Sequence, residues 1–191
     1  MEQAMNFQWY VDHYDQLLHE PNPPAPYDQP KYLEFTRLNL AHMNRWMRTG
    51  VLLPEAQALA EKITTSQHWT VITEAWCADA ANTIPFIRMF AALSERVKVT
   101  YELRDSPPFR INQYLTGASK SIPKLVIRDR EGHDLFVWGP RPVECQALYT
   151  RLLDEKAPFE TVKVEMQKWY NHDAGRSFQR ELVAGLTPLL A

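Results

Sequence analysis

The feature that most constrains the fold is a β-prone segment that leads directly into a cysteine and then into a helix. Residues Trp69 to Ala75 are rich in β-branched and aromatic side chains, and Trp76-Cys77 follows them directly. A helical stretch from Ile84 to Leu93 and a second β-prone segment from Val97 to Leu103 come next. This order of strand, helix and strand favours parallel pairing of the two strands, and so predicts an α/β fold.

A hairpin is predicted further along the chain. The strand candidates Lys124 to Arg128 and Leu135 to Trp138 flank a turn at residues 129–133, as in an antiparallel hairpin. A short helix ending near Tyr114 is expected before the hairpin, and a helix from Pro142 to about Leu153 is expected after it. The sheet is therefore expected to be mixed, with strands in both orientations.

Helical segments are expected on both sides of this core. Apolar residues recur at helical spacing from Tyr32 to Trp46, and Pro54 suits the first turn of a second helix. Between Glu20 and Pro26 four prolines exclude a regular helix and predict an extended arm on the surface. Near the C-terminus, residues 159–170 fit a helix better than a strand, and a last amphipathic stretch carries Phe178, Leu182 and Leu186.

These patterns predict three parts of the chain. Residues 1–66 form an N-terminal arm and helical extension, and residues 67–156 form the α/β core. Residues 157–191 form a C-terminal helical extension that packs on the core.

Composition narrows the classes of partner. The 21 basic and 23 acidic residues leave a formal charge of -2, which provides no broad positive field for nucleic acid or anionic lipid. No apolar stretch approaches the ~20 residues needed to cross a bilayer. Two cysteines in 191 residues suit a reducing compartment, so we expect a cytoplasmic protein that binds neither nucleic acid nor membranes. Nothing in the sequence indicates an oligomeric state.

Cys77 is the candidate for chemistry. A cysteine between a strand and a helix can lie at the helix N-terminus, where free amides and the helix dipole stabilise a thiolate. The small residues Ala78, Ala80 and Ala81 are expected to leave its sulfur accessible. The alternative is that a lone cysteine is a small buried apolar residue.

Four landmarks carry a resemblance to a known family. The segment Ala75 to Ala80 resembles the Trp-Cys-x-x-Cys signature of thioredoxins, and Pro85 stands where thioredoxins have the proline of the active-site helix. Ser121-Ile122-Pro123 resembles their cis-proline loop, and Gly139 stands at their groove glycine. The resemblance covers about residues 69–153. It implies a thioredoxin-like fold, with a central mixed sheet flanked by helices. Within the family, the chain is most similar to a bacterial branch with Trp-Cys-Gly-Asp-Ala in place of the dithiol motif.

The resemblance also implies a site. Cys77 would be the nucleophile, and it would face a cis peptide bond before Pro123. An extended substrate segment would pair with the backbone beside that proline. The groove residues in this chain would be Trp76, Ala78, Ile122, Pro123 and Gly139, with Asp79 beside them. The sequence also places Arg141 near the groove, either to stabilise a thiolate or anionic ligand or as a solvated arginine beside a helix start.

The sequence departs from the family pattern at two positions. Ala80 stands where the second cysteine of the dithiol motif belongs, and Val71 stands where the family has a buried acid. Asp79 is expected to stabilise the helix dipole and cap free amides, while its charge would raise the pKa of the thiol. Cys145 lies in a helix that the family geometry places away from the active-site rim, so it is not expected to act as a resolving thiol.

Two hypotheses follow. In the first, the protein is a monothiol thiol–disulfide oxidoreductase: Cys77 attacks a protein or low-molecular-weight disulfide, and an external thiol resolves the mixed disulfide. In the second, it is a non-catalytic thioredoxin-like module that holds a protein partner with the cis-proline groove and the helical extensions. Neither hypothesis requires a cofactor, and the six histidines show no ligand spacing that predicts a metal site.

Overall fold

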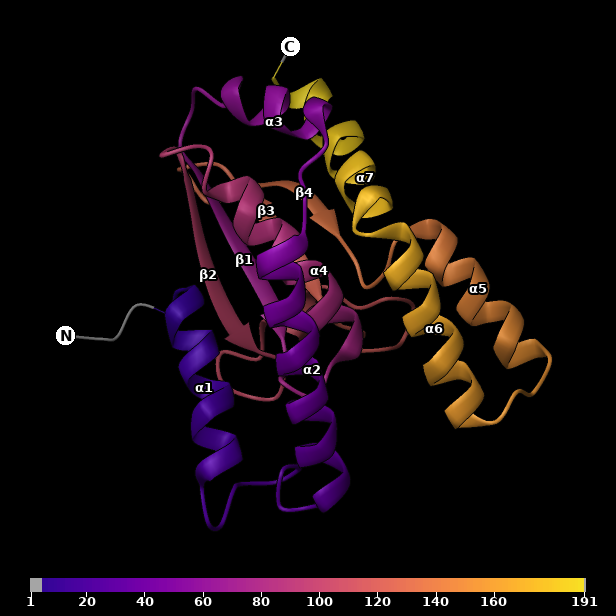
Figure 1. Ribbon diagram of the computed structural model, residues 1–191. Helices are drawn as coiled ribbons and strands as arrows, with labels where there is room; N and C mark the ends of the chain where they lie inside the picture. Colours follow the sequence, from indigo (N-terminus) through magenta and orange to yellow (C-terminus); the bar gives the residue numbers. More distant parts are fainter. Residues whose placement is uncertain (1–4, 191) are drawn as a thin grey trace.

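Four strands form the central sheet in the computed structural model, which describes residues 5–190. They are β1 (Gln67–Thr73), β2 (Val97–Leu103), β3 (Lys124–Arg128) and β4 (Asp134–Trp138), in the order β2-β1-β3-β4. β1 is parallel to β2 and antiparallel to β3, and β3 pairs antiparallel with β4. The predicted parallel pair, the hairpin and the mixed sheet are thereby confirmed (Figure 1).

The crossover helix α4 (Ala78–Ala91) covers the central strand and contains Pro85. Every residue of β1 except His68 is buried, which explains its continuous run of apolar and β-branched side chains. Trp69 stacks on Phe90 of α4, with 5.4 Å between the ring centroids. This packing holds the last turn of α4 against the first half of β1.

Three helices precede the sheet: α1 (Phe7–His19), α2 (Pro30–Thr49) and α3 (Pro54–Glu61). α2 and α3 agree with the predicted helices, and each begins with a proline in its first turn. α1 was not predicted. The side chain of Asn6 caps it, and Tyr10, Tyr14 and Leu17 form its buried face.

The segment after β2 contains only one short helix, the 3-10 turn η1 (Arg110–Gln113), where a short helix ending near Tyr114 was expected. Ile111 is its buried residue. The β3–β4 hairpin that follows has a register irregularity at Ile127 and Arg128.

The C-terminal part consists of α5 (Val143–Asp154), α6 (Phe159–Asp173), α7 (Arg176–Leu186) and the 3-10 turn η2 (Thr187–Leu189). The helix predicted for residues 159–170 is therefore confirmed. α7 joins the main core through Phe178, Leu182 and Leu186. α5 and α6 form a hairpin with a separate small core, and Figure 1 shows this hairpin projecting from the side of the molecule.

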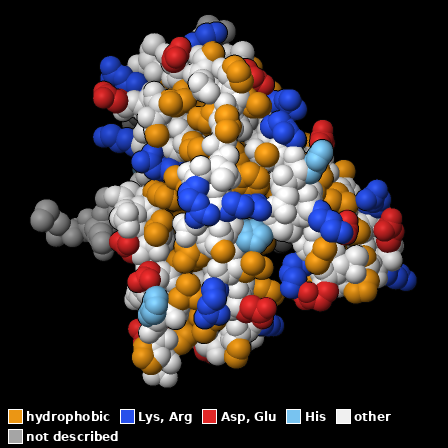
Figure 2. All heavy atoms as spheres, viewed as in Figure 1, with side chains coloured by type: hydrophobic (Ala, Val, Ile, Leu, Met, Phe, Trp, Pro, Cys, Tyr) orange, Lys and Arg blue, Asp and Glu red, His pale blue; other side chains and the backbone are white. Residues whose placement is uncertain are grey.

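No helix among residues 5–190 is long and apolar enough to cross a membrane. On the face that Figure 2 shows, basic and acidic side chains are interspersed, in keeping with the nearly balanced charge. The N-terminal helices, the sheet and α7 share one hydrophobic core, so the predicted N-terminal extension is packed into the body that carries the site.

Candidate functional site

Cys77 lies between β1 and α4, at the N-cap position of the helix. Its backbone N–H donates to the carbonyl of Glu74 at 3.0 Å, and its carbonyl accepts from the N–H of Ala81 at 3.2 Å. The tight turn and the first helical hydrogen bond together fix the direction of the thiol. The predicted position of the cysteine at a helix N-terminus is confirmed.

The thiol of Cys77 faces the loop before β3. Its Sγ donates a hydrogen bond to the carbonyl of Ile122 at 3.3 Å, and the Ile122–Pro123 peptide bond is cis. Only 5% of the Cys77 surface and 5% of the Ile122 surface are exposed. The structure thus brings together the cysteine and the proline loop that the sequence placed 45 residues apart, but it buries their contact.

Gly139 closes the other side of this loop. Its φ of +118° is a conformation that side chains rarely adopt, and a Cβ atom there would lie 2.2 Å from the carbonyl oxygen of Pro123. The ammonium group of Lys124 donates to the Gly139 carbonyl at 3.0 Å. The glycine therefore allows the end of β4 to approach the Pro123 loop at backbone contact distance.

The electrostatic surroundings keep the thiol protonated. Burial raises the pKa of Cys77 to about 12, and the charge of Asp79 adds to this increase. The N–H groups of Ala80 and Asp79 and the Arg141 guanidinium lower the pKa, but their effect is smaller. The expectation of an accessible thiol, stabilised as a thiolate by the helix, was wrong, because the neighbouring loop covers the sulfur and desolvation outweighs the helix N-terminus.

Asp79 raises the pKa of the thiol, as predicted, but it does not cap the amides of α4. α4 has no side-chain cap, and the Asp79 carboxylate instead accepts from the Tyr170 hydroxyl at 2.8 Å and pairs with the Arg141 guanidinium at 2.7 Å. Burial raises the pKa of Asp79, whereas Arg141 and Tyr170 oppose that shift. Asp79 therefore connects the first turn of α4 to the segment after β4 and to α6.

Arg141 lies next to the motif, as the sequence suggested. Its guanidinium also donates to Gln146 at 3.1 Å and lies 4.2 Å from the ring centroid of Tyr149. These contacts direct Arg141 toward Asp79 and the α5 helix. They hold a buried ion pair beside the thiol, with the Asp79 side chain only 12% exposed.

Trp76 and Ala78 form the accessible part of the motif. Ala78 is exposed and Trp76 is partly buried. The guanidinium of Arg104 lies 4.7 Å from the Trp76 ring centroid, and Tyr32 of α2 meets the same ring edge-on. Neither Arg104 nor Tyr170 was predicted as a site residue.

A second buried acid lies behind the motif. Glu74 accepts from the Tyr27 hydroxyl at 2.9 Å and from the backbone N–H of Asp105 at 3.1 Å. The Tyr27 hydroxyl in turn accepts from the N–H of Ala75 at 3.2 Å. Burial raises the pKa of Glu74, and these two donors oppose that rise. Glu74 is thus a buried carboxyl three residues before Cys77 in the chain, whereas the position where the family has its acid holds the buried Val71.

The raised pKa of Glu74 predicts a pH dependence of stability. The folded state binds the proton of Glu74 more tightly than the unfolded state, so Glu74 stabilises the fold less as the pH rises above ~4.5. We expect the free energy of unfolding of the native protein to fall relative to that of Glu74→Gln between pH 4.5 and 7. Urea denaturation of both proteins at several pH values measures this change. A native protein that gains stability relative to Glu74→Gln as the pH rises would contradict the prediction.

Cys145 is completely buried in the core of the α5–α6 hairpin, and both cysteines are free. Burial raises the pKa of Cys145 to about 12, the charge of Asp79 raises it as well, and the Tyr170 hydroxyl lowers it. Cys145 therefore shares the surroundings of Asp79, so α5 lies closer to the motif than expected. Its burial agrees with the expected packing role.

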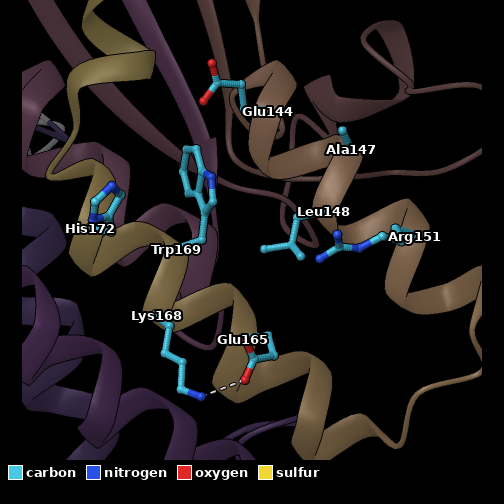
Figure 3. Close-up of a pocket in the computed structure, with 8 residues that line it drawn as sticks. All are labelled: Glu144, Ala147, Leu148, Arg151, Glu165, Lys168, Trp169 and His172. Atoms are coloured by element: carbon cyan, nitrogen blue, oxygen red, sulfur yellow. Dashed lines mark hydrogen bonds and ion pairs between the residues drawn. The ribbon is translucent and has the colours of Figure 1, made fainter.

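The basic and aromatic residues of α6 divide between its two sides: Phe159, Lys163 and Tyr170 face the motif, and Lys168, Trp169 and His172 line the outer hollow between α5 and α6. Figure 3 shows Lys168 paired with Glu165, and Trp169 and Leu148 in the hollow between α5 and α6. Among residues 5–190, no group of histidine, cysteine and acidic side chains is arranged to hold a metal ion.

Comparison with known proteins agrees with this geometry. A family model described as thioredoxin matches residues 27–156. A search of curated proteins finds no match.

Two of the solved structures that match resemble almost the whole chain. A 4E10 HIV epitope-scaffold is 16% identical with a TM-score of 0.58, and the match covers 97% of this chain and 94% of the scaffold. A Pseudomonas aeruginosa protein of unknown function is 15% identical with a TM-score of 0.56, covering 98% and 94% of the two chains. One component of the Enterococcus faecalis alkylhydroperoxide reductase matches 50% of this chain and 47% of its own, at 19% identity and a TM-score of 0.38. At these identities the likeness to the first two structures concerns the fold.

Proposed function

The chain belongs to the thioredoxin family, and we propose that it is a non-catalytic binding module of that family. We place it in the branch in which Trp-Cys-x-Asp-Ala replaces the dithiol motif. The observation that carries the proposal is the state of Cys77, whose thiol is buried and donates a hydrogen bond to the carbonyl of Ile122. Disulfide exchange requires a thiolate that can reach a second sulfur, and this thiol meets neither requirement.

The residues around the thiol support the same proposal. Ala80 is completely buried where a resolving cysteine would lie. The Asp79 carboxylate is held close by Arg141 and Tyr170, so a negative charge stays beside the sulfur and disfavours a thiolate. In an oxidoreductase, a cation next to the sulfur would lower the pKa of the thiol and favour the thiolate.

Binding is assigned to the surface that the extensions build around the motif. α2 and α6 stand on either side of Trp76 and Ala78 and enclose a cleft with them. The thioredoxin site then serves as the floor of a binding cleft. Two free cysteines suit a reducing compartment, so our proposal places the protein in the cytoplasm.

The proposal predicts that Cys77 does not react in the folded protein. In Cys145→Ala, we expect iodoacetamide at pH 7.5 to alkylate Cys77 more than a hundredfold more slowly in buffer than in urea, because burial suppresses both the thiolate and its access. Oxidised glutathione should add no mass to the folded protein. The double variant Cys145→Ala/Cys77→Ser, which has no cysteine, is the blank for both reagents. Alkylation at the rate of the unfolded chain, or a mixed disulfide at Cys77, would show that the folded protein exposes a reactive thiol and would overturn the proposal.

A further inference from the structure

The outer hollow between α5 and α6 is a concave surface separate from the motif. Every residue that lines it comes from these two helices, and none of them lines the cleft beside Trp76. Leu148 and Trp169 lie in the middle of the hollow (Figure 3) and are only partly buried, although both pack on the small core of the hairpin. Because a hairpin buries only one side of each helix, its open side is a surface on which further helices can pack.

On α5, the residues that line the hollow form a stripe along one face of the helix. They are Glu144, Ala147, Leu148 and Arg151, at the spacing of neighbours on a helix surface. Glu144 lies in the first turn of α5 and Arg151 lies in the last turn. Figure 3 shows their side chains at opposite ends of the stripe, with Leu148 between them. The stripe is therefore negative at its N-terminal end, positive at its C-terminal end, and small or apolar in the middle.

The stripe on α6 has the same spacing and the same order of charge. Glu165 comes first, and Lys168, Trp169 and His172 follow three, four and seven residues later. The Lys168 ammonium donates to the Glu165 carboxylate at 2.7 Å, so these two charges already pair within the chain. The charges that remain to select a partner are therefore those of α5.

The two charges of the α5 stripe have no close partner of their own. Glu144 makes no ion pair among residues 5–190, and the Arg151 guanidinium lies 3.9 Å from the Glu155 carboxylate, which is long for an ion pair. The side chains of Arg151 and Glu155 are 67% and 59% exposed, so water screens their attraction. Glu144 and Arg151 are thus available to charges on a second molecule.

A two-fold axis makes this stripe complementary to itself. When two copies of α5 pack antiparallel across such an axis, Glu144 of each copy lies against Arg151 of the other, and the apolar middles meet. Parallel packing would instead bring like charges together. The order of charge along α5 therefore matches a second copy of this chain, and it matches that copy only in the antiparallel direction.

We propose that two copies of this chain associate through the outer hollow, so that their two hairpins form a four-helix bundle. Two identical ion pairs between Glu144 and Arg151 fix the register and direction of the copies, and the contact of Leu148 and Trp169 supplies the apolar centre. The inference goes beyond the proposed function and does not depend on it. The cleft beside Trp76 stays open in both copies, because it shares no lining residue with the hollow.

The size of this surface predicts a weak, reversible dimer. α5 has 12 residues and α6 has 15, so the helices are only ~18 and ~22 Å long, and their faces give an interface at the small end of the specific ones. We expect a Kd of about 50 µM. Sedimentation equilibrium should show mostly the 22.3 kDa monomer at about 5 µM and mostly dimer at about 500 µM, under this Kd. A mass that stays at 22.3 kDa over this range would overturn the proposal.

Reversal of single charges tests the antiparallel pairing. Glu144→Arg and Arg151→Glu should each weaken self-association at least tenfold, because like charges then meet at both ends of the interface. An equimolar mixture of these two variants should associate with a Kd within threefold of the native value, because every pair in the mixed dimer is again of opposite charge. Such recovery also shows that both variants fold.

Glu160→Arg is the matched control, because it makes the same charge change on the same hairpin at an exposed residue outside the hollow. It should leave the Kd unchanged. Dimers that persist in both single variants, a mixture that fails to associate, or an equal loss in Glu160→Arg would each overturn the proposal. These results are separate from the reactivity of Cys77, so failure of the dimer leaves the proposed function in place.

Discussion

Arg141→Met should lower the free energy of unfolding by about 3 kcal/mol at pH 7, the cost of leaving one charge of a buried ion pair without its partner. The Arg141 and Asp79 side chains are 17% and 12% exposed, and their atoms approach to 2.7 Å. Methionine keeps most of the apolar stem, so the lost charge dominates the effect. Urea denaturation followed by circular dichroism measures the difference.

The effect of Arg141→Met should shrink as the pH falls from 7 to 5. The pKa of Asp79 is already raised by burial, and removing Arg141 takes away the main effect that opposes this rise. Protonation of Asp79 then relieves the buried charge, so the variant recovers stability toward acid pH. Arg151→Met is the control, because the pair of Arg151 with Glu155 is long and exposed, and its removal should cost less than about 0.5 kcal/mol. Equal losses in the two variants would contradict the prediction.

The core of the fold was predictable because its signals are local. The strand from Lys124 to Arg128 and the strand from Val97 to Leu103 have the predicted bounds, since each is a short β-prone segment between turn residues. The position of Cys77 at the start of a helix follows from the same local change of pattern.

α1 was missed because its buried face is made of tyrosines. Tyr10 and Tyr14 are completely buried, yet tyrosine does not stand out as an apolar stripe in a sequence. Their hydroxyls lie 3.2 Å apart, and that of Tyr10 lies 3.1 Å from the hydroxyl of Thr73 at the end of β1. The partner that allows these polar groups to be buried lies more than 50 residues away, and no periodicity reveals it.

The state of the thiol was beyond local prediction for the same reason. Asp79 was expected to act on its own helix, but its partners Arg141 and Tyr170 come from segments 62 and 91 residues further along the chain. Tyr170 also lies outside the segment that resembles thioredoxins. Only the folded arrangement shows that the C-terminal extension contacts the first turn of the motif helix.

Gly139→Ala should lower the free energy of unfolding by about 3 kcal/mol, through backbone conformation and steric overlap together. At a φ of +118°, any side chain is unfavourable, and the added Cβ would meet the Pro123 carbonyl oxygen at 2.2 Å. The backbone of residue 139 fixes the position of the Cβ atom, and the oxygen that it meets belongs to the backbone of Pro123, so neither a rotamer change nor a local side-chain shift relieves the overlap. The Pro123 loop must move, and it carries the Ile122 carbonyl that accepts from the Cys77 thiol.

Gly132→Ala separates the two causes. Gly132 also has a positive φ, of +91°, but a Cβ there meets nothing within 4 Å, so only the conformational cost of about 1 kcal/mol is expected. The difference between the two variants therefore measures the contact of Gly139 with the Pro123 loop. Because that loop covers the sulfur, Gly139→Ala should also speed alkylation of Cys77 under conditions where the protein stays folded, and Gly132→Ala should not. Equal destabilisation by the two substitutions would show that the close approach at Gly139 contributes nothing to the fold.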